Sequence, residues 1–202
     1  MRITRIHQIE MTSRCNLKCK YCIHPTMPRP KMDMSDEHFY RALELVDYFC
    51  KKGTQGAELN LCGTGESTLH PKFAEFVLAA RKTIGPHRMI ALPCNGINVS
   101  EDLIKVMAEA KVSVWVGMHR PERAGPVVNL MRKYGVLAGI STDPAMAAVN
   151  WAGQVNWEVT APRRPCPWLR EGRSFVMSDG KIGTCSFDGD GKEAVGHIMD
   201  DI

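Results

Sequence analysis

Three cysteines lie within eight residues near the N-terminus, in the segment Cys-Asn-Leu-Lys-Cys-Lys-Tyr-Cys that holds Cys15, Cys19 and Cys22. Three thiolates on one short loop can hold three irons of a cubane 4Fe–4S cluster and leave the fourth iron without a protein ligand. Clusters that only carry electrons normally take four cysteines. The spacing therefore predicts a loop that gathers its thiols at one point and an iron to which a substrate or cofactor can bind.

Clustered cysteines are also used for zinc binding and for disulfides. Structural zinc sites favour paired C-x2-C elements that supply four ligands, and Cys15 would be an unevenly placed third thiol. We find no signal peptide, so we expect a cytoplasmic protein in a reducing compartment, where disulfides are rare. The eight cysteines thus indicate metal chemistry. An iron–sulfur or zinc protein that binds a partner or transfers electrons remains the alternative to an enzyme.

Composition limits the partners. The chain has 202 residues, of which 44% are hydrophobic, enough for one sizeable core with a small appendage. No apolar run approaches the roughly 20 residues that span a bilayer, so no membrane association is expected. The net charge is only +4 and the basic residues are scattered, which argues against nucleic acid as a partner.

Short apolar runs alternate with helical patterns along the chain. Such alternation predicts right-handed βαβ units and a parallel sheet. About five to six units are too few for a closed eight-stranded barrel, so we expect an α/β fold that is a partial, open parallel barrel. A helix after Asp143 and a strand near 155–159 are weaker expectations. The main strands are expected at 6–11, 59–61, 89–92, 112–116 and 136–140, and the helices at 35–50, 71–80, 100–107 and 127–134.

Four unusual loops follow the expected strands, and the carboxyl ends of parallel strands lie at one edge of a sheet. Glycines let a backbone approach a ligand closely, and the carboxylate of Glu66 can accept a charge-assisted hydrogen bond. Asn-Gly is also an ordinary turn pair, so Asn95 can either shape a turn or contact a ligand. His119 likewise can either face a ligand or be an ordinary solvent-facing loop residue. The loops are the cysteine loop, Gly63–Glu66, Cys94–Gly96 and Gly117–His119.

The cysteine spacing, with Tyr21 just before the last cysteine, resembles the signature of radical S-adenosylmethionine (SAM) enzymes. In that family the open iron binds SAM, and an electron from the cluster cleaves SAM to methionine and a 5′-deoxyadenosyl radical that abstracts hydrogen from the substrate. The resemblance implies a 4Fe–4S cluster on Cys15, Cys19 and Cys22, SAM as cofactor, and an external flavodoxin- or ferredoxin-like electron donor. It also implies a peptide or small natural-product substrate.

The segment after the second expected strand resembles the family's glycine–glutamate turn, although many members have proline where Ser67 stands. The resemblance implies that the Glu66 carboxylate meets the SAM amino group. It assigns no catalytic residue, and we expect Cys50, Cys62 and Cys94 to be packing residues. The implied cofactor-binding residues are Tyr21, Gly63, Thr64, Gly65, Glu66, Asn95 and His119.

The character of the chain changes near Pro165. Two apolar runs around an Asp-Gly pair predict a small C-terminal β-hairpin over 174–185. With Cys166 before it and Cys185 at its end, it resembles the start of the SPASM or twitch extension of one radical SAM branch, where such cysteines begin an auxiliary cluster. We therefore expect a core over 1–160 and a shortened extension over 161–202.

Only two thiols are present in that extension, whereas four would normally hold a cluster. A second iron–sulfur cluster with other ligands, a zinc site that borrows His197, a hairpin without metal, and further ligands after residue 202 in a longer chain all remain open. Within this branch the reaction would be an oxidation, an epimerisation or a cross-linking, so the chain is expected to be an oxidoreductase-type enzyme.

Overall fold

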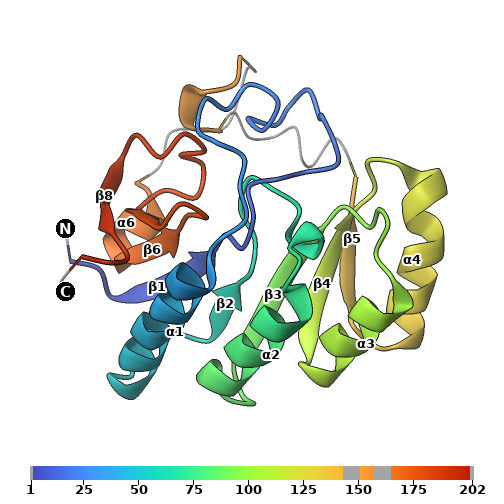
Figure 1. Cartoon of the computed structure of the whole chain (residues 1–202), viewed down its shortest axis with the longest axis horizontal. Coiled ribbons are helices and arrows are strands. Elements are labelled where there is room, and N and C mark those ends of the chain that lie inside the picture. Colours follow the sequence, from blue (N-terminus) through green and yellow to red (C-terminus); the bar gives the residue numbers. More distant parts are fainter. Residues whose placement is uncertain (1, 143–150, 157–164, 201–202) are drawn as a thin grey trace.

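The computed structural model describes residues 2–142, 151–156 and 165–200 (Figure 1). In this part of the chain, one sheet holds the strands in the order β5-β4-β3-β2-β1-β6-β7-β8. The strands are β1 (Arg5–Ile9), β2 (Glu58–Asn60), β3 (Met89–Cys94), β4 (Val112–Gly117), β5 (Leu137–Ser141), β6 (Arg173–Val176), β7 (Lys181–Gly183) and β8 (Ala194–His197). The helices are α1 (Asp36–Lys51), α2 (Phe73–Ile84), α3 (Glu101–Glu109), α4 (Pro121–Lys133) and α6 (Pro167–Glu171), with 3-10 turns η1 (Ser67–Leu69) and η2 (Trp151–Gly153).

The sheet is parallel from β5 through β1 to β6, and only β7 and β8 run antiparallel to their neighbours. Helices α1 to α4 lie along one side of it (Figure 1). This confirms the expected α/β fold with an open, mostly parallel sheet and a C-terminal hairpin. In the described part of the chain, no helix has the length and apolar composition that a bilayer span requires.

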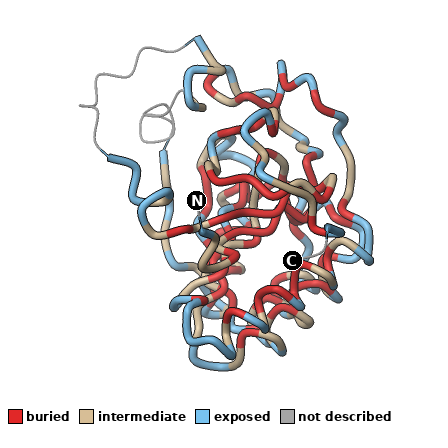
Figure 2. The backbone as a smooth tube through the Cα atoms, turned by 90° about the vertical axis from the view of Figure 1, so that its left-hand side faces the viewer, coloured by how far each residue is buried: buried red, intermediate tan, exposed pale blue. Residues whose placement is uncertain are grey.

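Local sequence explains the helices that line the sheet. Ser35 caps α1 by accepting a hydrogen bond from the backbone N–H of His38 at 3.2 Å, as a serine N-cap does. The buried stripe of α1 includes Phe39, whose ring stacks on Phe76 of α2 with centroids 3.8 Å apart. Helix α4 begins at Pro121, earlier than predicted, because proline is favoured at the first helical position. Figure 2 shows the buried residues concentrated along the sheet and the helix faces that cover it.

The C-terminal hairpin belongs to the main sheet and is not a separate appendage. Its first strand, β6, pairs in parallel with β1, with Ile6 opposite Ser174 and Ile9 opposite Val176. The predicted hairpin segment therefore extends the main sheet, and β8, which was not predicted, pairs with β7 as a further strand. Val155 and Asn156 do not form a strand. The rest of that predicted strand, the helix predicted after Asp143 and the boundary at residue 160 lie outside the described residues.

Candidate active site

A cavity of about 460 Å³ opens at the carboxyl ends of the strands. All four predicted loops contribute to its wall, so residues far apart in the chain share one space. In Figure 1 the loop that carries the cysteines passes over the upper ends of the strands. The predicted residues in the wall are Cys15, Cys19, Tyr21, Cys22, Gly63, Thr64, Gly65, Glu66, Cys94, Asn95 and His119.

The cysteine loop is closed at its base by backbone contacts. Thr12 and Asp33 form an isolated antiparallel bridge, and the Thr12 hydroxyl donates to a carboxylate oxygen of Asp33 at 2.7 Å. The N–H of Met34 donates to the carbonyl of Met11 at 2.8 Å. Because both ends of the loop are tied together, its thiols are held above the sheet edge.

The three thiols lie close enough to influence one another. Burial raises the pKa of Cys15 to about 11, and the negative charges of Glu66 and of the two other cysteines add to the rise. Burial also raises the pKa of Cys22, with Cys19 contributing. Three thiolates at this place therefore need a cationic partner to be stable.

The triad fits a cluster better than a single ion. Among the described residues, no three His, Cys, Asp or Glu side chains are grouped tightly enough to hold one metal ion. A cubane takes each thiolate on a different iron, so its ligands stand further apart than those of one zinc ion. Cys15, Cys19 and Cys22 are the residues that would hold it.

The glycine turn fits against the base of the cysteine loop only because its glycines lack side chains. A Cβ on Gly63 would stand under 3.0 Å from side-chain atoms of Glu10, and one on Gly65 under 3.0 Å from the backbone oxygens of Thr12 and Arg14. The N–H of Glu66 donates to the carbonyl of Arg14 at 2.7 Å. The turn is therefore fixed beside the cysteine loop.

Glu66 is 4% exposed and holds a dense set of hydrogen bonds. Its carboxylate accepts from the N–H of Asn95 at 2.7 Å and from the hydroxyl of Thr68 at 2.8 Å. Burial raises its pKa, while these donors and the Cys94 thiol act in the opposite direction. The carboxylate is thus oriented by its neighbours before any ligand arrives.

Asn95 has a clear positioning role. Its side-chain amide donates to the side-chain oxygen of Asn16 in the cysteine loop at 2.7 Å, and its own oxygen accepts from the N–H of Ile97 at 2.9 Å. The second contact is the turn role that its Asn-Gly sequence favours. Asn95 therefore joins the loop after β3 to the cysteine loop.

Tyr21 and His119 form one contact between two loops. The Tyr21 hydroxyl hydrogen-bonds to Nδ1 of His119, and the indole N–H of Trp151 donates to the Tyr21 carbonyl at 3.2 Å. Tyr21 is buried, whereas His119 is half-buried. His119 is thus fixed by a partner in the cysteine loop and is not a free loop side chain.

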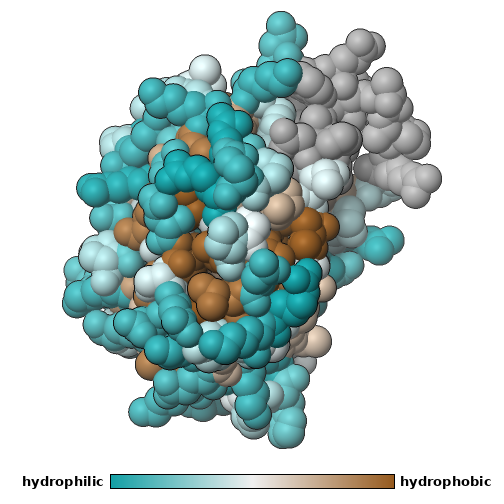
Figure 3. Space-filling view, turned by 90° about the vertical axis from the view of Figure 1, so that its right-hand side faces the viewer, coloured by the Kyte–Doolittle hydropathy of each residue, from teal (hydrophilic) through white to brown (hydrophobic). Residues whose placement is uncertain are grey.

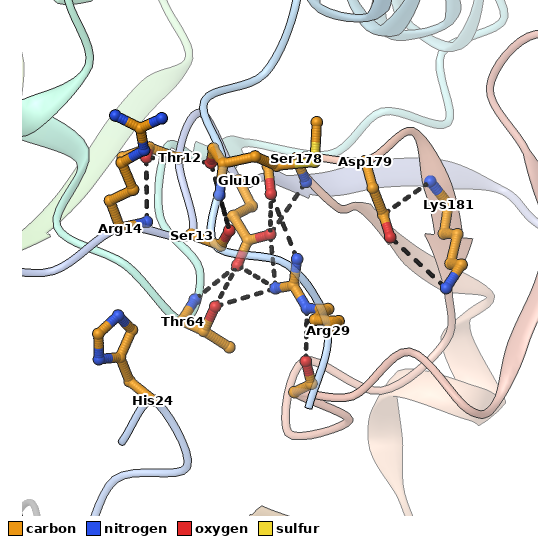
Figure 4. Close-up of polar contacts among 12 residues, drawn as sticks. Glu10, Thr12, Ser13, Arg14, His24, Arg29, Thr64, Ser178, Asp179 and Lys181 are labelled. Carbon is orange, nitrogen blue, oxygen red and sulfur yellow. Dashed lines mark hydrogen bonds and ion pairs between the residues drawn. The ribbon is translucent and has the colours of Figure 1, made fainter. Parts of the chain in front are cut away.

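A buried ion pair that the sequence analysis did not single out joins four segments around this site (Figure 4). One guanidinium nitrogen of Arg29 lies 2.6 and 2.7 Å from the two carboxylate oxygens of Glu10. The same carboxylate accepts from the N–H and hydroxyl of Thr64 and of Ser178. The signal was Glu10 near the carboxyl end of the first expected strand, since a charge that is buried there needs a partner. Arg29 also donates to the carbonyl of Gly189 at 2.6 Å, which ties the C-terminal region to the cysteine loop.

Comparison with known proteins decides the family. A family model described as the radical SAM superfamily matches residues 9–161.

The chain belongs to the radical SAM superfamily.

Two curated relatives extend this result. The tungsten-containing aldehyde ferredoxin oxidoreductase cofactor-modifying protein of Pyrococcus furiosus is 28% identical over 151 residues, which cover 73% of this chain and 39% of that protein. A GTP 3′,8-cyclase of Mycobacterium sp. (strain KMS) is 31% identical over 178 residues, which cover 87% of this chain and 48% of that protein. The chain thus spans less than half the length of either relative.

A solved structure shares the fold. The crystal structure of BtrN in complex with AdoMet and 2-DOIA has a TM-score of 0.79 and 18% sequence identity, and the match covers 98% of this chain and 80% of that chain. At this identity the likeness concerns the fold alone. It agrees with the open sheet of a radical SAM core.

The rest of the cavity is aromatic and neutral. Trp115, Trp151 and Phe187 line it, and the last two pack edge to face with centroids 5.9 Å apart. Gln8 and two serines are the other polar side chains of this part, and no Lys or Arg occurs among the described lining residues. Figure 3, which views the β5 end of the sheet, shows apolar residues gathered within a hydrophilic surround.

The cysteines outside the triad have different environments. Cys50 packs partly buried against the core, and Cys94 belongs to the core while also reaching the cavity wall. Cys62 lines the cavity, and burial raises its pKa to about 12. Packing accounts for Cys50, whereas Cys62 and Cys94 also line the cavity.

The two C-terminal cysteines lie near one another. Cys166 is exposed and Cys185 is half-buried, and burial followed by the charge of Cys166 raises the pKa of Cys185. Nε2 of His197 lies 3.0 Å from the carbonyl oxygen of Asp179, and its ring packs against His38. His197 is therefore engaged with other groups, and the described residues contain no completed metal site around this pair.

Proposed function

We propose that this chain is the core of a radical SAM enzyme that binds a 4Fe–4S cluster on Cys15, Cys19 and Cys22 and cleaves SAM reductively. The observation that carries the proposal is that the three thiols and the Gly63–Glu66 turn share the wall of one cavity. When bound, the cluster supplies the electron that converts SAM to methionine and a 5′-deoxyadenosyl radical, which takes a hydrogen atom from the substrate.

The residues of the cavity have separate tasks in this proposal. The oriented carboxylate of Glu66 accepts a hydrogen bond from the SAM amino group, as a buried carboxylate does strongly with a cation. Gly63 and Gly65 let the turn pack against Glu10 and the cysteine loop, which sets the position of Glu66. Asn95 and His119 hold the loops that face the cofactor, each through its contact with the cysteine loop.

The lining of the cavity supports a neutral substrate group. The polyphosphate of a nucleotide is normally bound by Arg, Lys or backbone N–H groups, and the described lining residues include no Arg or Lys. Trp115 and Phe187 offer aromatic surfaces that are 38% and 41% exposed. We therefore favour a peptide or a small neutral natural product, on which hydrogen abstraction leads to oxidation, epimerisation or cross-linking.

The C-terminal hairpin is a reduced SPASM- or twitch-like extension in this proposal. Cys166 and Cys185 do not hold a full auxiliary cluster by themselves, because two thiols supply half of the usual ligand set. We also propose that the protein is cytoplasmic and that a flavodoxin- or ferredoxin-like protein is its electron donor.

The alternative is an iron–sulfur or zinc protein without radical chemistry. Such a protein has no need for a buried, oriented carboxylate beside its thiols. Glu66 and the Gly63–Gly65 turn lie in the same cavity wall as the triad, which favours the enzyme.

The test is an assay for 5′-deoxyadenosine. The protein is reconstituted anaerobically with iron and sulfide, reduced with dithionite and mixed with SAM, and the product is measured by mass spectrometry. We expect product from the wild type, none from Cys19→Ala, and wild-type amounts from Cys50→Ala, whose thiol lies on α1. Full activity of Cys19→Ala would contradict the proposal, and an intact cluster without product would support the alternative.

A further inference from the structure

A second hollow, of about 260 Å³, adjoins the cysteine loop. It shares four wall residues with the large cavity, namely Leu17, Cys19, Tyr21 and His119. Cys15 and Cys22 line only the large cavity, so Cys19 is the one cysteine of the triad in the walls of both spaces. The proposed cluster site therefore borders a second space on the side of Cys19.

The hollow carries a concentrated positive charge. Its three other wall residues are Lys18, Lys20 and Arg120, and no Asp or Glu lines it among the described residues. All three are exposed, and the two lysines stand directly before and after Cys19. The large cavity has no Lys or Arg in its described wall. The two spaces thus differ in charge, and electrostatic attraction favours binding of an anionic partner at the hollow over the large cavity.

We propose that this hollow is the docking surface for an acidic one-electron carrier protein, and that the electron enters at Cys19. This inference rests on the proposed function. The carrier loses one electron and the cluster gains one, and no atom is transferred. Exposed cations that surround an entry point raise the association rate of an acidic protein by electrostatic attraction.

The experiment compares two triple variants of the reconstituted protein that change the net charge equally. Lys18→Glu/Lys20→Glu/Arg120→Glu reverses the charge of the hollow. Lys51→Glu/Lys105→Glu/Lys133→Glu reverses three exposed lysines on α1, α3 and α4. The readouts are the rate of loss of visible absorbance on mixing with an acidic, reduced flavodoxin, and the Kd of oxidised flavodoxin by calorimetry at two salt concentrations.

We expect the hollow variant to lower the reduction rate and the affinity at low salt at least tenfold. Because its hollow repels an acidic carrier, added salt should raise its rate, whereas added salt should lower the wild-type rate. The control triple should stay within about twofold of the wild type. Reduced methyl viologen, a small cation, should reduce both variants at no less than the wild-type rate, which shows that the cluster is intact. Equal effects of the two triples with flavodoxin would overturn the docking surface. Wild-type protein that methyl viologen reduces without forming 5′-deoxyadenosine would refute the proposed function but leave the docking result standing.

Discussion

The ion pair of Glu10 and Arg29 gives the sharpest prediction about stability. Their side chains are 1% and 4% exposed, and the pair joins the end of β1 to the cysteine loop. Arg29→Met removes the counter-charge and leaves the carboxylate buried. Breaking a buried pair in this way costs about 3–5 kcal/mol. Because four donors from Thr64 and Ser178 remain on the carboxylate, we expect the lower end, about 3 kcal/mol.

Urea unfolding of the metal-free protein measures this loss. With a slope of about 2 kcal/mol per M, the midpoint should fall by about 1.5 M. The control is Lys51→Met, which breaks the exposed pair of Lys51 with Asp47 and should leave the urea midpoint nearly unchanged. The double variant Glu10→Gln/Arg29→Met should be less destabilised than the sum of its single changes, by about 2 kcal/mol. If Arg29→Met lost no more stability than Lys51→Met, the reasoning would be refuted.

Three further predictions concern the cavity. Gly65→Ala should weaken SAM binding to the reconstituted protein more than tenfold, because its Cβ would meet backbone oxygens under 3.0 Å away, whereas Gly196→Ala, with its nearest contact at 3.4 Å, should bind normally in equilibrium dialysis. Thr68→Ala removes the hydroxyl that donates to the Glu66 carboxylate at 2.8 Å and should raise the SAM Kd about fivefold, about 1 kcal/mol; Thr68→Ser should restore it, and equal losses in both variants would contradict the role of the hydrogen bond. In the metal-free protein at pH 8, Cys62 is almost wholly protonated because its pKa is about 12, so it should be alkylated long after the exposed Cys166 and should gain reactivity as the pH rises; mass spectrometry that finds Cys62 modified first would contradict this order.

Much of the fold was predictable because its signals are local. The stripe that contains Phe39, the cap at Ser35 and the apolar runs of the strands each need only neighbouring residues. The parallel order follows from the alternation of strands and helices. The meeting of the four loops follows in turn, because carboxyl ends of parallel strands lie at one edge.

The parts that were missed depend on contacts between distant residues. No local sequence pattern indicates that β6 pairs with β1, since an apolar strand can join any free edge of a sheet. The contact of Glu10 with Arg29 joins residues on opposite ends of a long loop. The face of β4 on which Trp115 lies was predictable from local sequence. In Val112-Ser113-Val114-Trp115-Val116 the alternation places Trp115 on the face opposite that of the valines. The alternation does not indicate that this face borders a cavity.

The most direct measurement of the central claim is electron paramagnetic resonance of the reconstituted, reduced protein with and without SAM, together with iron analysis. The account predicts about four irons per chain, because one cubane bound by three cysteines contains four. It also predicts a spectrum that changes when SAM is added, and loss of both features in Cys19→Ala. A four-iron cluster whose spectrum is unaffected by saturating SAM would contradict the claim that the cluster and the Glu66 turn form one SAM site.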